Sequence, residues 1–467
     1  MLQNEATDLG PSADAALAVA DQRRPRLADR TSTAPSPAID QSAVDTMAAV
    51  LLAPLDSRRR DHHRFPRLSG RPALYLLASL IVSLLASSSA PTPLYAVYQA
   101  RWGFSPITTT IVFGIYAVSV LVALLTLGKL SDHVGRRPIL LAALAAQAAA
   151  MLVFATADGV PALMIARVVQ GVATGSALGA IGAGMLDIDP RRGTLANAVS
   201  PGFGTASGAL LSALAVQFLP APTHLIYLAL LGVFAVQALG IALIRETVTR
   251  TPGALASLKP EIKLPRTVRG PVLAAAPVLF AVWALAGLYG ALGPALVSTL
   301  TGSSSVVLGG LSLFLLAAIA SVAVIVLRGA QPRAVMLTGI VALAVGVVIT
   351  LVSLSLPASS PSSSSSSSLP AVLFFTGTVI SGIGFGSGFQ GGIRTVIPLA
   401  AAHERSGVLS LLFVISYLGM GLPAVASGFL TVHGQGLTGA AREYGAALLV
   451  LAALALVGLL RARTAKH

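Results

Sequence analysis

The sequence predicts an all-α membrane protein whose twelve transmembrane helices form two pseudo-symmetric bundles of six. Of its 467 residues, 55% are hydrophobic and only 10% are charged, and the mean hydropathy is +0.82. Soluble domains carry about 25% charged residues, so most of this chain must face lipid. Long apolar runs recur from Ala73 onward, each near the ~20 residues that a membrane helix needs. Finally, QGVATGSALGA (170–180) aligns with SGIGFGSGFQG (381–391), as expected of two halves related by an axis along the membrane normal.

Residues 1–71 differ in composition from the rest of the chain. They hold nine of the seventeen acidic residues, are rich in Pro, Ser and Ala, and contain no long apolar run. We therefore expect a disordered cytoplasmic N-terminal tail. Alternatively, translation starts at Met47, and residues 1–46 do not belong to the protein.

Twelve spans are expected along the remainder of the chain. They form an N-terminal bundle (72–245) and a C-terminal bundle (271–461), separated by a central cytoplasmic loop (246–270) and followed by a short cytoplasmic tail (462–467). A serine-rich loop, SSPSSSSSSS (359–368), separates spans nine and ten. The expected spans are 73–90, 107–127, 138–157, 161–186, 194–217, 223–244, 271–296, 304–327, 334–355, 371–397, 407–431 and 444–460.

Lys and Arg are distributed unevenly between the two sets of loops. With the N-terminus inside, they fill the loops of one side, and only Arg101 and Arg442 fall on the other. Because cytoplasmic loops carry an excess of Lys and Arg, we expect both termini in the cytoplasm and a multi-pass protein of the cell inner membrane.

Several other classes of protein are disfavoured. The chain contains no cysteine, which excludes disulfides, thiolate catalysis and Cys-ligated metals. The expected spans contain no paired carboxylates, metal ligands or base-assisted nucleophile at depth, and the chain has no Walker A motif. We therefore expect neither an enzyme nor an ATP-driven pump, and no cofactor or metal. The net charge of +14 is attributed to topology and anionic lipid rather than to nucleic-acid binding.

The stretch GKLSDHVGRRP (128–138) places charge and glycine between two uncharged apolar runs. Gly128 has no side chain where span two ends, so another helix can approach closely, and Gly135 permits a tight turn before span three. If the loop is helical, Arg136 can pair with Asp132 one turn away. The Asp132 carboxylate would also be favourable beside the N-terminus of span eleven, near Gly407.

This pattern resembles the loop 2–3 motif of the major facilitator superfamily, and the resemblance extends over about residues 72–461. It implies a central cavity that opens alternately to the two sides, and a cytoplasmic latch in which Asp187 is the third charged member. The expected latch residues are Gly128, Asp132, Gly135, Arg136, Arg137 and Asp187. Alternatively, the charges only set topology, although a topogenic loop needs neither the glycines nor Asp132.

Inside the membrane, ionisable residues are costly and are therefore functional candidates. Arg167 and Gln170 share one face of span four, where RVVQGVATG resembles the family's span-four motif. Arg167 is a candidate for substrate contact or coupling, or it braces the bundle through carbonyl groups of span one. Gln390 and Arg394 in span ten are weaker candidates, and we favour interfacial snorkelling for Arg394 over substrate contact. Aromatic and amide side chains are as often packing elements, but six of them are further candidates to line a cavity: Gln147, Gln237, Gln390, Trp283, Tyr289 and Tyr417.

The resemblance predicts a secondary active transporter that works by alternating access on a small organic molecule, with efflux favoured because this loop motif is common in drug-export relatives. The expected spans hold no deep Asp, Glu or His, and PGFGTASGALLSAL (201–214) departs from the family's antiporter motif. A neutral or anionic substrate therefore fits better than a cation. The alternatives are an uptake permease for a small anionic metabolite and a transport-inactive sensor. The expected partners are the lipid bilayer, the substrate and protons as the candidate coupling ion, with a monomer as the functional unit.

Overall fold

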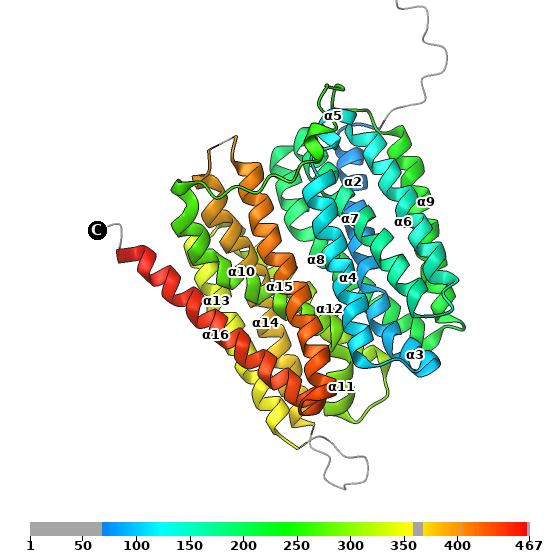
Figure 1. Ribbon diagram of the computed structural model, residues 1–467, viewed down its shortest axis with the longest axis vertical. Helices are drawn as coiled ribbons and strands as arrows, with labels where there is room; N and C mark the ends of the chain where they lie inside the picture. The colour runs from blue at the N-terminus through cyan, green and yellow to red at the C-terminus, as the bar shows by residue number, and fades with distance from the viewer. Residues whose placement is uncertain (1–67, 358–367, 402, 465–467) are drawn as a thin grey trace, which may run out of the picture. The chain divides into compact units, whose positions relative to one another are not determined.

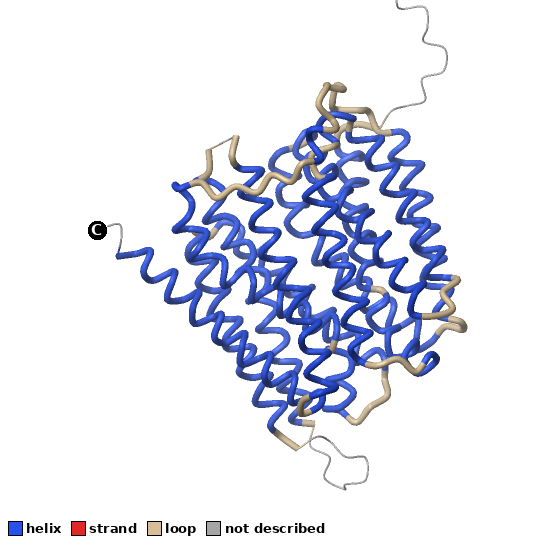
Figure 2. The backbone as a smooth tube through the Cα atoms, in the orientation of Figure 1, coloured by secondary structure: helices blue, strands red, loops and turns tan. Residues whose placement is uncertain are grey.

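The computed structural model describes residues 68–357, 368–401 and 403–464. The chain divides into two units, residues 1–64 and residues 65–467, and every feature below belongs to the second. The expected N-terminal tail, except for residues 68–71, and most of the serine-rich loop lie outside the described residues. The described backbone is helical apart from the long central loop, shorter connecting loops and an isolated β-bridge between Leu68 and Ile244 (Figure 2).

Within the described residues, twelve helical segments are long and apolar enough to cross a membrane, which confirms the predicted fold class. The first six spans and the short helix α5 contain residues 71–243 (Figure 1). Their bounds are α2 (Arg71–Ser89) with α3 (Pro91–Trp102), α4 (Pro106–Leu127), α5 (Ser131–Val134), α6 (Arg136–Ala155), α7 (Val160–Ile188), α8 (Pro190–Phe218) and α9 (Pro222–Leu243).

The second six spans contain most of the chain from residue 269 onward. Their bounds are α10 (Arg269–Ala291) with the short α11 (Gly293–Thr301), α12 (Val306–Val326), α13 (Pro332–Ser355), α14 (Leu369–Val396), α15 (Arg405–His433) and α16 (Gly436–Thr464). Short 3-10 turns lie in the central loop at Ala256–Leu258 and Arg266–Val268, after α12 at Leu327–Gly329, and after α14 at Ile397–Leu399.

The first span of each half is longer than predicted, and each is interrupted near a proline. Pro91 begins α3 directly after α2, and Pro294 lies at the start of α11 directly after α10. Proline lacks a backbone N–H but fits the first turn of a helix, so the chain can bend there and resume. The last span also begins earlier than predicted, at Gly436, so Arg442 lies in its second turn. There the Arg442 guanidinium donates to the carbonyl oxygen of Leu354, at 2.5 Å.

Small residues allow the helices to approach closely. A Cβ atom on Gly171 would lie 2.9 Å from the Tyr116 carbonyl oxygen, and one on Gly175 would lie 2.5 Å from that of Val120. One on Gly179 would lie 2.7 Å from the carbonyl oxygen of Gly128. This stripe of α7 therefore serves packing against α4, as membrane helices do where backbones approach each other.

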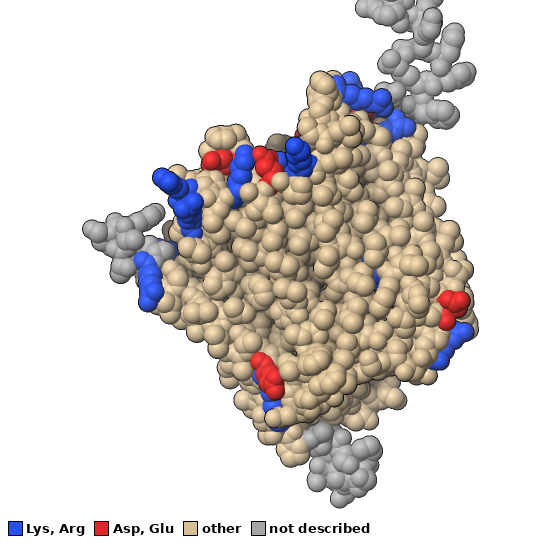
Figure 3. All heavy atoms as spheres, in the orientation of Figure 1, with Lys and Arg blue, Asp and Glu red and all other residues tan. Residues whose placement is uncertain are grey.

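Two helix pairs make most of the contacts between the halves: α4 packs against α15, and α8 packs against α12. Each pair takes one helix from each half. Charged side chains gather at the two ends of the molecule in Figure 3, and the middle of this view is almost entirely uncharged. We call the end that carries α5 and the central loop the loop face.

Candidate functional site

The loop after α4 makes a tight turn at Gly135. This glycine has a φ of +111°, which side chains other than hydrogen rarely tolerate. A Cβ atom there would also lie 2.8 Å from Oε2 of Glu246. Both the backbone and the surrounding space therefore require glycine at the turn that the sequence predicts.

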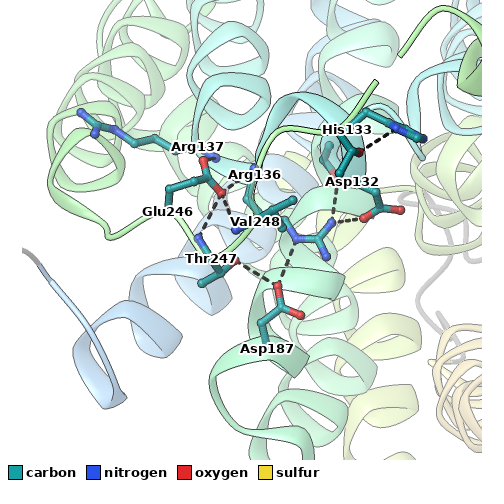
Figure 4. A network of polar contacts seen from close by, with 10 residues as sticks. Asp132, His133, Arg136, Arg137, Asp187, Glu246, Thr247 and Val248 are labelled. Atoms are coloured by element: carbon teal, nitrogen blue, oxygen red, sulfur yellow. Dashed lines mark hydrogen bonds and ion pairs between the residues drawn. The ribbon is translucent and has the colours of Figure 1, made fainter. Parts of the chain in front are cut away.

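Arg136 is the centre of the charge network on the loop face (Figure 4). Its guanidinium pairs with Asp132, as expected across one helical turn, and with Oδ2 of Asp187 at 3.2 Å. It also donates to the Ser131 hydroxyl at 2.9 Å. Only 13% of the Arg136 side chain is exposed, so these contacts are less screened than a surface pair. The structure thus brings together Asp132, Arg136 and Asp187.

Glu246 joins this network from the residues that follow α9. Its carboxylate accepts hydrogen bonds from the backbone N–H groups of Arg136 and Arg137, both at 2.9 Å. These are the first N–H groups of α6, where a negative charge is stabilised by unpaired donors and the helix dipole. The Thr247 hydroxyl donates to Asp187 at 3.0 Å, so the same segment reaches both sides of Arg136.

Sequence reasoning missed the contacts of Glu246, although its place at the end of span six put it on the same side as the arginine pair. Arg137 enters the network through its backbone, and its guanidinium is directed away from the Asp132–Arg136–Asp187 group in Figure 4. The side chain of Asp132 is 55% exposed, and its ion-pair partner among the described residues is Arg136 rather than the first turn of α15. That turn is reached by the central loop, where the Lys263 N–H donates to the Gly407 carbonyl at 3.2 Å.

Arg167 is fully buried, about two turns after the start of α7. Its guanidinium donates to the Tyr95 hydroxyl, to the Ser88 carbonyl at 2.8 Å and to Oε1 of Gln170 at 2.7 Å. Ring faces surround it as well, with the Tyr116 centroid 5.2 Å from its central carbon. The buried guanidinium has no carboxylate partner among the described residues. Cation–π contacts and the dipoles of the hydroxyl, carbonyl and amide groups stabilise its charge instead. One of these contacts, with the Ser88 carbonyl, is of the kind that the bracing alternative predicts for span one, and the role of Arg167 stays a prediction.

Gln170 explains why the first span can bend. Within a helix, the carbonyl of Ser87 would accept the N–H of residue 91, but Pro91 has none. Nε2 of Gln170 donates to this carbonyl at 3.0 Å, and Gln170 is itself fully buried. The Gln147 amide donates to the Ser87 hydroxyl at 2.7 Å. Gln170 of α7 thus replaces the missing backbone donor, and Gln147 of α6 holds the side chain of the same serine.

The span-ten candidates occupy different surroundings. The Arg394 guanidinium donates to the Ala330 carbonyl at 2.8 Å and to that of Leu327 at 3.4 Å. It therefore binds two carbonyl groups of the turn that follows α12. This placement agrees with an interfacial role for Arg394. Gln390 is partly buried, and its amide makes no hydrogen bond to a described residue.

Four aromatic rings of the second half form a cluster around Trp283. The centroid of its ring lies 5.0 Å from that of Tyr417, 5.5 Å from that of Phe389 and 6.1 Å from that of Phe385. The indole Nε1 is buried and has no hydrogen-bond partner among the described residues. Sequence reasoning identified Trp283 and Tyr417 but missed Phe385 and Phe389, whose four-residue spacing was the available signal.

Packing contacts show where the cluster faces. On α14, Gly388 and Gly392 contact α10, whereas Gly382 and Gly386 contact α12. With 100° per residue, Phe385 and Phe389 lie between these two faces of α14. Since α12 packs on α8 and α15 packs on α4, the rings face the region between the two halves.

Similarities of this chain to known proteins agree with this architecture. The family model of the Major Facilitator Superfamily matches residues 76–331, more than half of the chain. An uncharacterized transporter of Rickettsia bellii (strain RML369-C) is 40% identical over 74 residues, which is 15% of this chain and 18% of the relative's length. The crystal structure of the nucleoside transporter NupG (D323A mutant) has a similar fold, with a TM-score of 0.59 and 14% identity over 84% of this chain and 98% of that chain. With its twelve spans and its family match over more than half of its length, the chain belongs to the Major Facilitator Superfamily.

Proposed function

We propose that this transporter exports a small neutral or anionic organic molecule that contains a planar ring, by alternating access. Membership of the superfamily and the transporter relatives support transport rather than an enzymatic reaction. The single observation that carries the substrate class is the aromatic cluster of Trp283, Phe385, Phe389 and Tyr417.

The cluster suits a planar organic molecule for two reasons. Aromatic faces stack on unsaturated rings and contribute about 0.5–1.5 kcal/mol for each favourable pair beyond their buried area. The indole N–H of Trp283 lacks an acceptor among the described residues, so an oxygen or nitrogen atom of a substrate could accept its hydrogen bond. Ligand sites commonly combine apolar walls with a few such polar groups.

The charge distribution supports a neutral or anionic substrate. Across the described ranges, every Asp, Glu and His lies in a loop or within about two turns of a helix end. Among the described residues, the fully buried charge is that of Arg167, whose donors are directed to protein groups. A cationic substrate would therefore find no carboxylate in the middle of these spans, and desolvating a cation without a partner is costly.

The direction and the orientation are part of the proposal. The excess of Lys and Arg in one set of loops supports a cytoplasmic loop face and cytoplasmic termini. Uptake is the second candidate, because one solved relative is titled a nucleoside transporter and a nucleobase is a planar ring of the kind that this cluster would hold.

A binding screen followed by flux tests the proposal. The melting temperature of the purified protein is measured in the presence of each member of two matched pairs of compounds. The pairs are uridine with ribose, and benzoate with cyclohexanecarboxylate. We expect at least one ring compound to stabilise the protein more than its non-aromatic partner, since a ligand that binds only the folded state raises stability. Trp283→Leu should abolish that difference, whereas Trp102→Leu, which removes a tryptophan stacked on Tyr98 in the other half, should preserve it.

Flux then separates the remaining alternatives. The stabilising compound is followed in sided proteoliposomes, with and without a proton gradient. Net movement away from the loop face indicates export, and movement toward it indicates uptake. Binding without movement in either direction would identify a sensor. Equal stabilisation by the aromatic and saturated partners would contradict the role assigned to the aromatic cluster.

A further inference from the structure

The central loop between α9 and α10 is fastened to the first half by backbone and ring contacts. The N–H of Thr251 donates to the carbonyl of His133 at 3.0 Å. The His133 ring nitrogen Nδ1 lies 3.2 Å from the carbonyl oxygen of Pro252. Gly253, with a φ of +106°, turns the chain beside the same ring. The loop thus begins its course on the motif between α4 and α6.

The middle of the loop is held at the end of α4. The short turn Ala256–Leu258 packs against α4. Farther along, the Glu261 carboxylate forms an ion pair with Lys129, which lies two residues beyond the last residue of α4. Lys129 occupies a position of the loop motif for which the expected latch had no role.

The other end of the loop is fastened to the second half. Glu261 also pairs with Lys263 at 2.6 Å, and the Lys263 N–H donates to the Gly407 carbonyl in the first turn of α15. The approach is close, because a Cβ atom on Gly407 would lie 2.9 Å from Cβ of Lys263. The loop therefore connects α4 of one half with α15 of the other.

We propose that residues 251–263 form a strap that holds the two halves together on the loop face, and that the Lys129–Glu261 ion pair is its releasable fastening. This inference rests on the alternating-access mechanism proposed above. It differs from the Asp132–Arg136–Asp187 group, because those three residues all belong to the first half, whereas the strap spans both.

Chain geometry explains why the fastening must release. Glu261 and Lys263 are two residues apart, so the backbone between the two anchors spans at most about 7 Å. When α4 and α15 separate on this face, Lys129 and Gly407 move apart, and both contacts of so short a segment cannot persist. The ion pair is the weaker anchor, since 33% of the Lys129 side chain and 39% of the Glu261 side chain are exposed and salt screens such pairs.

The test measures distance on the loop face of the full-length protein. Because the chain has no native cysteine, spin labels can be placed at Arg191→Cys, at the start of α8, and at Arg328→Cys, after the end of α12. Both positions are exposed and lie outside the strap. Glu261→Gln should raise the ratio of long to short distances about two- to fivefold, the range for a partly exposed ion pair. Added salt should open the wild type but have less effect on the variant.

Charge exchange distinguishes the ion pair from a general structural effect. Lys129→Glu alone should open the loop face as Glu261→Gln does, and the double exchange Lys129→Glu/Glu261→Lys should restore the wild-type distribution. Glu443→Gln in α16, an exposed acidic residue outside the central loop, should change nothing. Melting temperature and size-exclusion profile identify misfolded variants, and the double exchange remains decisive if a single variant misfolds.

The outcomes separate the strap from the proposed transport. An unchanged distance distribution in folded Glu261→Gln, or failure of the double exchange to restore closure, would overturn the strap even if ring compounds are transported. A shifted and restored distribution in a protein that moves no ring compound would support the strap and would count against the proposed transport function.

Discussion

Replacing Gln170 tests whether α7 supplies the hydrogen bond that Pro91 removes from the first span. Gln170→Met keeps the length of the side chain but leaves the Ser87 carbonyl without its donor at 3.0 Å and removes the acceptor of Arg167 at 2.7 Å. An unsatisfied buried carbonyl costs about 1–3 kcal/mol in soluble proteins. Hydrogen bonds between membrane helices average only about 0.6 kcal/mol. With two bonds lost, we expect the free energy of unfolding to fall by about 1–2 kcal/mol.

A double-mutant cycle isolates the carbonyl from the rest of that cost. Ala90 is helical, and its N–H already donates to the Ala86 carbonyl at 2.9 Å. In Pro91→Ala, the new N–H of residue 91 should therefore donate to the Ser87 carbonyl. The cost of Gln170→Met should then fall by about half, since one of its two bonds is replaced, and the two substitutions should be non-additive.

The assay is reversible unfolding in lipid-like micelles or bicelles, measured for the wild type, both single variants and the double variant. Gln237→Met is the matched control, because Gln237 is a buried glutamine whose bonds go to the hydroxyl groups of Ser79 and Ser83. Its cost should be the same with Pro91 or Ala at position 91. Additive costs for Gln170→Met and Pro91→Ala would refute the substitution of a side-chain donor for a backbone donor.

Three further predictions concern the loop face. Asp132→Asn should raise accessibility to thiol reagents from that face, because Arg136 loses one of its two carboxylates. The readout is labelling of a cysteine introduced at Ser416, which is fully buried within α15; unchanged labelling would show that Asp132 does not help to keep this face closed. Glu246→Gln should lower the melting temperature more than Glu443→Gln, because Glu246 accepts the first N–H groups of α6; equal shifts would argue against that role. Lowering the pH from 7 to 5 should not change the long-to-short distance ratio through Glu261: its pairing with Lys129 and Lys263 lowers its pKa from 4.5 to about 2. The stabilisation by its charged form is present above the unfolded pKa and is lost as the pH falls through about 2; an opening at pH 5 that Glu261→Gln abolishes would contradict this assignment.

The spans could be predicted because lipid imposes a length and a polarity on each of them. Their interruptions were harder to place. The apolar run of the first span ends near Pro91, yet the helix resumes through a polar segment to Trp102. At the start of α16, Arg442 was assigned to a loop, but its guanidinium finds a carbonyl of α13. A hydropathy profile cannot predict a hydrogen bond of this kind, because it depends on which helix packs beside the arginine.

The site shows the same division between local and distant contacts. The pairing of Arg136 with Asp132 follows from four-residue spacing, and the turn at Gly135 follows from its residue type. The contacts of Glu246 and Glu261 join segments more than 100 residues apart. No spacing rule predicts these contacts, since they depend on where the central loop runs across the packed helices.

The bend between α2 and α3 also has a mechanical consequence. A helix usually resists bending because its own hydrogen bonds must lengthen or break. Here the Ser87 acceptor is already bound to Gln170 of α7, and the Ser88 carbonyl is bound to Arg167 of the same helix. The bend before α3 is thus held by its neighbour, so a swing of α3 about this point would pull on two polar side chains of α7.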